Sequence, residues 1–133
     1  MFTEGKTYNR RQDIHAKFGG NIQSGISPCA NYPYVFLFTS PSGEEHGYQD
    51  KWVSNSVYIY SGEGQYGDMD LVRGNKAIKN HKADGRELHL FEKEQTGEYR
   101  YLGQFEYLGH EVKSGTDTDE KKRKVILFSL QKL

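Results

Sequence analysis

The sequence has little of what would mark a secreted, membrane-bound or zinc-binding protein: one cysteine, three prolines and no long apolar run. A single cysteine, Cys29, excludes a disulfide within the chain and a cysteine-based zinc site, and we expect it to be a small core residue. No apolar run reaches membrane-spanning length, and residues 1–6 lack the apolar region of a signal peptide. We therefore expect a cytoplasmic protein that does not contact a membrane.

An excess of charge of either sign is also absent, because 18 basic residues balance 18 acidic ones. Nucleic-acid-binding domains are usually basic, so the net charge alone argues mildly against that class. The distribution of charge matters more than the sum, and basic residues cluster in residues 6–17, 73–86 and 121–124. A neutral chain can thus still have one basic face, although scattered, solvated charges would give the same composition.

The length and composition fit one globular domain over residues 1–133. Charged residues make up 27 % of the chain and aromatic residues 14 %, which is typical of a folded rather than a disordered chain. Ten tyrosines accompany a single tryptophan. Because tyrosine combines an apolar ring with a polar hydroxyl, it suits half-buried strands and recognition surfaces.

Strands dominate the expected secondary structure. Apolar or alternating residues predict strands at residues 34–39, 57–61, 87–91, 99–112 and 125–128, a bend or bulge at Gly103, and polar loops at 21–31 and 114–122. Two short helices are predicted, over residues 7–18 with Thr7 as the N-cap and over residues 70–81. The pattern predicts a strand-dominant α+β fold, a bent antiparallel sheet or small β-barrel with two short flanking helices.

Catalytic motifs are not found. The five histidines form neither an HExxH pair nor a zinc-binding pattern. Asn80-His81 hints at an HNH nuclease, but the partner histidine and the strand-turn-helix context are missing. We therefore expect a binding domain without catalysis, cofactor or metal. A small nuclease that uses His81 or Asp50 with a metal is the alternative.

The segment from residue 47 to residue 65 carries the most information. Tyr48 lies in a loop after a glycine, Asp50 follows two residues later, and Tyr60, expected to be exposed, ends a strand beside the hydroxyl of Ser61. Two rings can stack on a flat heterocycle, at about 1–3 kcal/mol per base, and a carboxylate can accept from the N4 amine of cytosine. Together they could offset the few kcal/mol that base flipping costs. On spacing alone, ordinary sheet residues and a turn cap at Asp50 are the favoured interpretation.

Three motifs of this region resemble a known family. Gly47-Tyr48-Gln49-Asp50, Tyr60-Ser61-Gly62-Glu63-Gly64-Gln65 and Gly74-Asn75-Lys76 resemble the SRA (SET- and RING-associated) domain, which binds 5-methylcytosine by base flipping. Residues 77–81, 88–92 and 101–103 resemble the SRA-like domain of bacterial modification-dependent (type IV) restriction endonucleases, which is fused to an HNH nuclease. The resemblance spans residues 18–130 and implies a PUA/SRA-like fold and a nuclease in another domain or subunit.

The resemblance also implies a role for each residue of the central motif. Tyr48 and Tyr60 would sandwich the flipped base, and Asp50 would read its amine edge. Ser61 stands where the family has threonine and would bond the base edge, while backbone amides around Gly47 would add contacts. The implied partner is double-stranded DNA that contains 5-methyl- or 5-hydroxymethylcytosine.

Two positions depart from the family pattern. Lys51 stands where eukaryotic members have a second acidic residue, and the Asn-Lys-Arg finger reads Asn75-Lys76-Ala77. The orphaned guanine would then be read differently, or by another loop such as residues 20–27. The expected contacts to the DNA backbone or the orphaned base are Arg10, Arg11, Arg73, Asn75, Lys76, Lys79 and Lys82. A solvated helix face is the alternative for these cations, and a PUA-like reader of modified RNA is the alternative for the chain.

Overall fold

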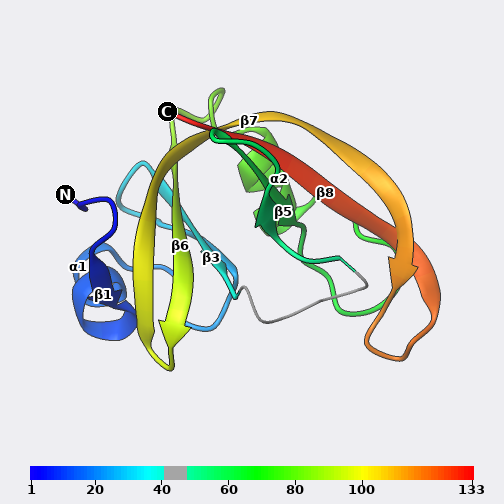
Figure 1. Ribbon diagram of the computed structural model, residues 1–133, viewed down its shortest axis with the longest axis horizontal. Helices are drawn as coiled ribbons and strands as arrows, with labels where there is room; N and C mark the ends of the chain where they lie inside the picture. Colours follow the sequence, from blue (N-terminus) through cyan, green and yellow to red (C-terminus); the bar gives the residue numbers. More distant parts are fainter. Residues whose placement is uncertain (41–47) are drawn as a thin grey trace.

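The computed structural model describes residues 1–40 and 48–133 and contains one strongly bent sheet (Figure 1). Its strands run in the order β2-β3-β6-β7-β8-β5-β4, and β1 pairs with β7. They are β1 (Thr7–Asn9), β2 (Ile26–Pro28), β3 (Tyr34–Thr39), β4 (Lys51–Trp52), β5 (Val57–Ser61), β6 (Glu87–Gln95), β7 (Glu98–Thr116) and β8 (Lys122–Lys132). The helical elements are the π-helical turn η1 (Arg10–His15), α1 (Ala16–Phe18) and α2 (Arg73–Lys79). The strand-dominant α+β prediction is confirmed, and the sheet stays open.

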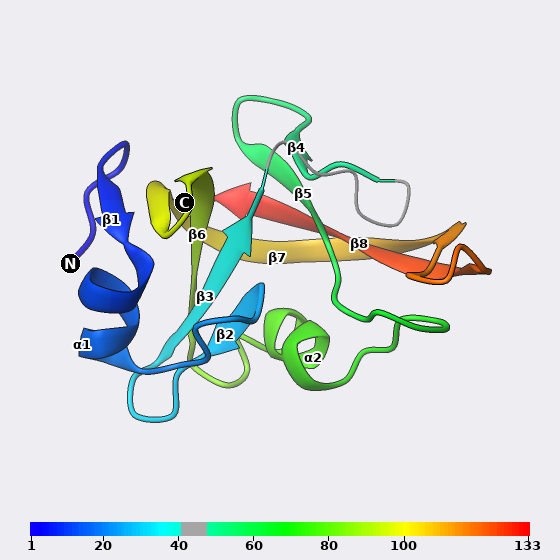
Figure 2. The same cartoon turned by 90° about the horizontal axis from the view of Figure 1, so that it is seen from below.

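Strand β3 is almost entirely buried, because nearly all of its residues are apolar. It pairs antiparallel with β2 and parallel with β6, where Leu37 faces Leu90 in the ladder. Successive side chains of a strand point to opposite faces, so Val35 and Leu37 pack in the larger core with α2, and Phe36 and Phe38 pack in an aromatic core. Helix α1 and β1 lie beside the aromatic core, and α2 lies against the other face (Figure 2).

The first predicted helix is only partly correct. Residues 7–9 form β1 instead, and the side chain of Asn9, not Thr7, caps the helical turn by accepting from the N–H of Gln12 over 2.8 Å. The helical segment ends at Gly19, whose φ of +77° suits glycine. The second predicted helix is shorter than expected, because only residues 73–79 are helical.

The two longest strands, β7 and β8, exceed their predicted lengths. They form an arch over the molecule in Figure 1, and their pairing continues out to Thr116 opposite Lys122. The bulge expected near Gly103 is confirmed: Leu90 pairs with Gly103 and Phe91 with Tyr101, so Leu102 is the extra residue.

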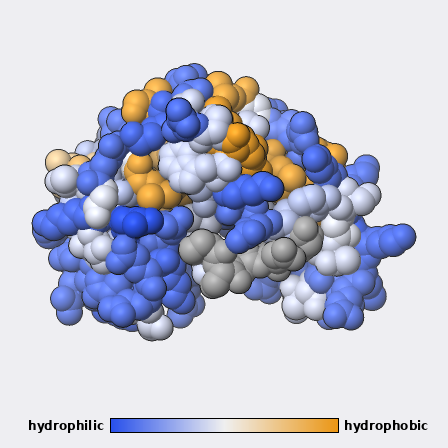
Figure 3. Space-filling view, in the orientation of Figure 1, coloured by the Kyte–Doolittle hydropathy of each residue, from blue (hydrophilic) through white to orange (hydrophobic). Residues whose placement is uncertain are grey.

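Two further expectations concern buried and apolar residues. Cys29 is 1 % exposed and packs in the aromatic core, as predicted. Among the described residues, no helix has the length and apolar character that crossing a membrane requires. The face drawn in Figure 3 is hydrophilic over both flanks, with apolar side chains gathered near the top of the arch.

Candidate nucleic-acid interface

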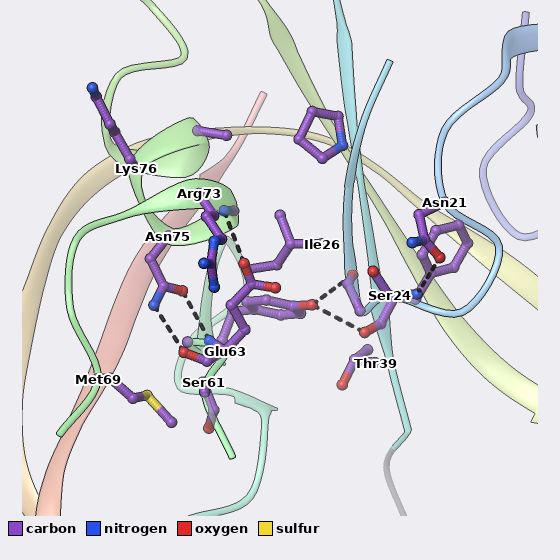
Figure 4. A pocket seen from close by; sticks show the side chains of 18 of the residues that line it. Asn21, Ser24, Ile26, Thr39, Ser61, Glu63, Met69, Arg73, Asn75 and Lys76 are labelled. Carbon is purple, nitrogen blue, oxygen red and sulfur yellow. Dashed lines mark hydrogen bonds between the residues drawn. The ribbon is translucent and has the colours of Figure 1, made fainter. Parts of the chain in front are cut away.

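A cavity of about 1270 Å³ lies between the loop before β2, the ends of β3 and β5, and the start of α2 (Figure 4). It brings together most of the residues that the sequence singled out: Arg10, Tyr48, Asp50, Tyr60, Ser61, Arg73, Asn75 and Lys76. The described residues that line the cavity do not include Arg11, Lys79 or Lys82. Gly47 lies outside the described residues.

The carboxylate of Asp50 is held between two strands. Its Oδ1 accepts from the backbone N–H of Ser61 over 2.7 Å, and its Oδ2 accepts from the hydroxyl of Thr39 over 2.8 Å. Thr39 ends β3 and Ser61 ends β5, so the two bonds fix the carboxylate where both strands reach the cavity. Sequence reasoning missed Thr39, because the residue meets Asp50 only through tertiary structure.

The hydroxyl of Ser61 has an unused hydrogen-bonding capacity. Its Oγ is buried and has no hydrogen-bond partner within the described part of the chain, although the residue lines the cavity. A buried polar atom left unpaired costs about 1–3 kcal/mol. A ligand that bonds this hydroxyl would recover that cost.

Both tyrosines of the motif line the cavity, but their exposure differs from the prediction. Tyr60 is 3 % exposed, so the expectation of an exposed ring is wrong. Its hydroxyl lies 2.9 Å from the carbonyl of Gly25 and 3.1 Å from that of Phe38, which ties the ring to the loop before β2 and to β3. Tyr48 is half-buried, and its hydroxyl donates to the carbonyl of Ser114 in β7 over 2.5 Å. Each ring is therefore held by a different strand.

Asn75 is a structural residue in this fold. It is 1 % exposed; its amide donates to the carbonyls of Glu63 and Asp70 over 3.0 and 2.9 Å, and its Oδ1 accepts from the N–H of Glu63 over 2.8 Å. These bonds join α2 to the loop after β5. The expected contact of Asn75 with DNA does not suit a side chain that is buried and fully bonded.

Arg10 is also buried rather than displayed. It is 7 % exposed, and its guanidinium donates to the carbonyls of Asn21 and Ser24 over 3.0 and 2.6 Å. Burial lowers the pKa of this guanidinium from its ordinary value, although a hydrogen bond to Tyr99 opposes the shift. We therefore correct the expectation that Arg10 contacts a phosphate.

The other expected cations are exposed. Arg73 and Lys76 line the cavity; Arg73 turns toward Glu63, whereas Lys76 points outward (Figure 4). Arg11 and Lys79 are exposed on η1 and α2. Lys82, outside the described lining, pairs with Glu106 of β7 over 2.9 Å.

The loop after β5 holds features that the sequence did not reveal. Arg123, a member of the basic cluster at residues 121–124, is 5 % exposed and donates to the carbonyls of Gly64 and Gly67 over 2.8 Å each. The carboxylate of Asp117 accepts from the N–H of Gly67 over 3.2 Å. Tyr66, inside this braced loop, is 62 % exposed. The glycine-flanked tyrosine at residues 64–67 is the only signal that could have pointed to it.

His81, considered for nuclease chemistry, is held inside the fold by its ring nitrogens. His81 is 4 % exposed, its Nδ1 donates to the carbonyl of Arg86 over 2.8 Å, and its Nε2 accepts from the N–H of Tyr107 over 3.0 Å. Both ring nitrogens are thus occupied by the fold. Within residues 1–40 and 48–133, no three histidine, cysteine, aspartate or glutamate side chains gather in a way that could hold a metal ion.

The open bent sheet matches the fold of SRA domains. More specifically, the chain belongs to the family of ScoMcrA-like SRA domains, whose family model matches residues 4–133. The resemblance seen in the sequence is therefore confirmed and extends further toward the N-terminus. A search of curated proteins found no match.

Solved structures agree with this assignment. ScoMcrA, as its sulfur-binding and SRA domains complexed with phosphorothioated DNA, is 23 % identical with a TM-score of 0.77, covering 100 % of this chain and 40 % of that one. The SUVH5 SRA domain in complex with methylated CHH DNA is 24 % identical with a TM-score of 0.69, covering 98 % and 88 %. The restriction endonuclease AspBHI is 15 % identical with a TM-score of 0.70, covering 90 % and 37 %. The chain spans 40 % and 28 % of two ScoMcrA structures.

Proposed function

We propose that this domain binds double-stranded DNA at a modified cytosine, 5-methyl- or 5-hydroxymethylcytosine, and holds the flipped base in the cavity. The observation that carries the proposal is that the cavity is lined by both an oriented carboxylate, that of Asp50, and an unsatisfied hydroxyl, that of Ser61. Asp50, oriented by Thr39 and Ser61, would accept from the N4 amine of cytosine. The unpartnered Oγ of Ser61 would bond the neighbouring edge of the base.

The two tyrosines supply the apolar part of the site. Stacking on an aromatic ring contributes about 1–3 kcal/mol per base, and extruding a base costs a few kcal/mol. Tyr48 is half-buried and can cover one face of the base, while the buried ring of Tyr60 forms part of the wall. Stacking and the charge-assisted hydrogen bond together are of the size that flipping requires.

The exposed cations around the cavity would hold the duplex. Arg73 and Lys76 lie at the rim and Lys79 follows on α2, so they can contact phosphates, which position DNA without reading its sequence. The gap left by a flipped base needs a filling side chain, as apolar wedges provide in other DNA-bending proteins. Because Asn75 is buried, we propose that the exposed ring of Tyr66 fills the gap. Hydrogen bonds from Arg123 to backbone carbonyls hold the loop that carries this ring.

The neighbours support a ligand of this class. Their structures contain phosphorothioated DNA for ScoMcrA, and methylated and hydroxymethylated DNA for SUVH5. ScoMcrA and AspBHI are restriction endonucleases, and ScoMcrA is longer than this chain. We therefore extend the proposal to the specificity domain of a modification-dependent restriction endonuclease whose HNH-type nuclease lies in another domain or subunit.

A fluorescence assay tests base flipping directly. A duplex would carry 2-aminopurine next to a single 5-methylcytosine, so that its emission rises when the neighbouring base leaves the stack. We expect emission to rise on binding of the wild-type domain and to stay low for an otherwise identical unmodified duplex. Tight binding of the methylated duplex without any rise would overturn the flipping step.

A further inference from the structure

Arg10 is a buried cation at one end of the cavity, and its surroundings are unusual. Its guanidinium lies 3.6 Å from the centre of the Phe38 ring and 5.7 Å from that of Tyr99. No carboxylate within the described residues pairs with it, and the two loop carbonyls of Asn21 and Ser24 accept hydrogen bonds from it instead. Burying an unpaired charge is costly, so these carbonyls and rings must stay in place for the arrangement to persist.

His15 accepts a further hydrogen bond from Arg10, and it can do so only when its ring is neutral. The Nε–H of Arg10 donates to Nε2 of His15 over 2.9 Å, and Nδ1 of His15 lies 2.8 Å from the carbonyl of Gly19. A guanidinium only donates hydrogen bonds. Nε2 must therefore carry a lone pair and Nδ1 the proton. A second proton, on Nε2, would place an N–H of His15 opposite the Nε–H of Arg10, and the hydrogen bond between the two residues would be lost.

The loop that Arg10 holds reaches the wall of the proposed base site. Arg10 binds the carbonyl of Ser24, and the next residue, Gly25, lies 2.9 Å from the Tyr60 hydroxyl through its carbonyl oxygen. The carbonyl of Gly25 also accepts from the N–H of Phe38 over 2.8 Å. Arg10, Ser24 and Gly25 all line the cavity, and Figure 4 shows Ser24 and Asn21 on the side away from α2. A short path of hydrogen bonds thus joins Arg10 to Tyr60.

We propose that Arg10 is a positioning residue for this cavity, and that His15 makes the positioning sensitive to acid. Protonation of His15 breaks its bond with Arg10, frees the loop of residues 21–25 and weakens the grip on the modified base. The effect on DNA rests on the proposed function, whereas the effect on the loop does not.

Of the described groups that face His15, Arg10 is the one that carries a charge. The rings of Phe36 and Phe38 approach it from β3 at 6.4 and 5.6 Å. Gly20 lies close to both Ser27 and His15: a Cβ built on it would lie 2.5 Å from Oγ of Ser27 and 3.3 Å from Nδ1 of His15. Burial lowers the pKa of His15 from its ordinary 6.5; the hydrogen bond to Gly19 partly opposes this shift, and Arg10 adds a smaller lowering. Arg10 and His15 together with the loop of residues 21–25 are called the clamp below. The clamp is intact at neutral pH, where His15 is uncharged, and it weakens as the pH falls below 6.5.

An NMR titration of the free domain tests the clamp without DNA. Between about pH 7.5 and pH 5, where histidine titrates, the amide signals of residues 21–25 should shift with the same midpoint as the His15 ring. In His15→Gln, whose amide oxygen can still accept from Arg10, these signals should stay still. In Arg10→Met they should resemble those of the acid form at every pH. Loop signals that ignore the titration of His15, or that titrate unchanged in His15→Gln, would overturn the proposal.

A binding titration at constant ionic strength tests the consequence for DNA. Affinity for a 5-methylcytosine duplex should fall roughly tenfold between about pH 7.5 and pH 5.5 in the wild type, the order expected for a lost buried hydrogen bond. It should fall less in His15→Gln, while the control His110→Gln should behave as the wild type. An equal loss in wild type and His15→Gln would overturn the link. If the loop titrates as expected but no variant prefers modified DNA, the proposed function fails and the clamp stands.

Discussion

Asp50 and Ser61, eleven residues apart in the sequence, are joined at the cavity by a 2.7 Å hydrogen bond from the backbone N–H of Ser61 to the carboxylate. The same carboxylate accepts from Thr39, so residues of two strands fix its orientation. A carboxylate that is already oriented loses little freedom when a ligand arrives, which favours binding. Asp50 is therefore the centre of the proposed recognition.

Replacing Asp50 by Asn should weaken binding of modified DNA while keeping the side chain's shape. The amide oxygen can still accept from Ser61, but the charge that favours the N4 amine is lost. We expect a loss of about 1–3 kcal/mol in binding free energy, the usual value for a base-reading contact. Fluorescence anisotropy with a methylated duplex measures it. An Asn variant with unchanged affinity would remove Asp50 from the site.

Replacing Tyr48 by Ala should cost about 1–3 kcal/mol of binding, because one stacking surface is lost. The fold should survive, since Tyr48 is only half-buried. Tyr48→Phe is the matched control: it keeps the ring and removes only the bond to the carbonyl of Ser114. Calorimetric titration of both variants would show a large loss for Ala and a smaller one for Phe. Equal affinities for Ala and wild type would argue against stacking.

Asn75→Ala should lower stability rather than affinity alone. The substitution leaves backbone groups of Glu63 and Asp70 without partners, at about 1–3 kcal/mol for a buried unsatisfied group. Urea denaturation measures the change in the free energy of unfolding. The neighbouring exposed Lys76→Ala is the control and should stay within about 0.5 kcal/mol of the wild type. An unchanged urea midpoint for Asn75→Ala would restore the possibility of a surface role.

Lys76→Ala and Lys79→Ala should weaken binding of modified and unmodified duplexes equally, because phosphate contacts carry no sequence information. Each should reduce the slope of log affinity against log salt by about one. Lys82→Ala is the control, since Lys82 pairs with Glu106. A selective loss for the modified duplex would instead place one of the two lysines at the base.

Stability should fall in mild acid because of His89. This residue is 3 % exposed; its Nε2–H donates to Glu87 over 3.0 Å and its Nδ1 accepts from the Tyr101 hydroxyl over 2.7 Å. Burial lowers its pKa from 6.5, and Glu87 only partly opposes the shift. Below pH 6.5 the unfolded chain therefore binds more protons than the folded one, and the free energy of unfolding decreases as the pH falls toward the folded-state pKa.

Urea denaturation at about pH 7.5 and pH 5.5 checks this, with His89→Gln as the variant that cannot titrate. The wild type should lose more stability than the variant over that interval. His15 acts in the same direction in both proteins, so the difference between them isolates His89. The same loss in both would assign the acid sensitivity to other groups.

The sequence predicted the strands well where apolar residues mark them, as in residues 34–39 and 57–61. It missed the outer parts of β7 and β8, because backbone pairing such as that of Thr116 with Lys122 needs no apolar side chain. The central motif was found because its residues are close in sequence. Thr39 was missed because only the fold brings it to Asp50.

Burial explains the remaining errors at the site. Arg10, Asn75 and Arg123 have the residue types of a DNA-binding surface, yet each is buried and bonds backbone carbonyls. Residue type and local spacing do not reveal which polar side chains the fold uses to satisfy its own loops. Tyr60 was expected to be exposed for the same reason: alternation in β5 separates two faces but does not say which one meets the core.

The most direct test of a cytosine-reading cavity is a fluorescence-anisotropy competition at one fixed salt concentration. The competitors would be matched duplexes carrying unmodified cytosine, 5-methylcytosine, 5-hydroxymethylcytosine or a single phosphorothioate linkage. We expect a duplex with a modified cytosine to compete best, and Asp50→Asn to weaken its binding by about 1–3 kcal/mol. Equal, strongly salt-dependent competition by all duplexes, or a preference for the phosphorothioate alone, would contradict a cytosine-reading cavity.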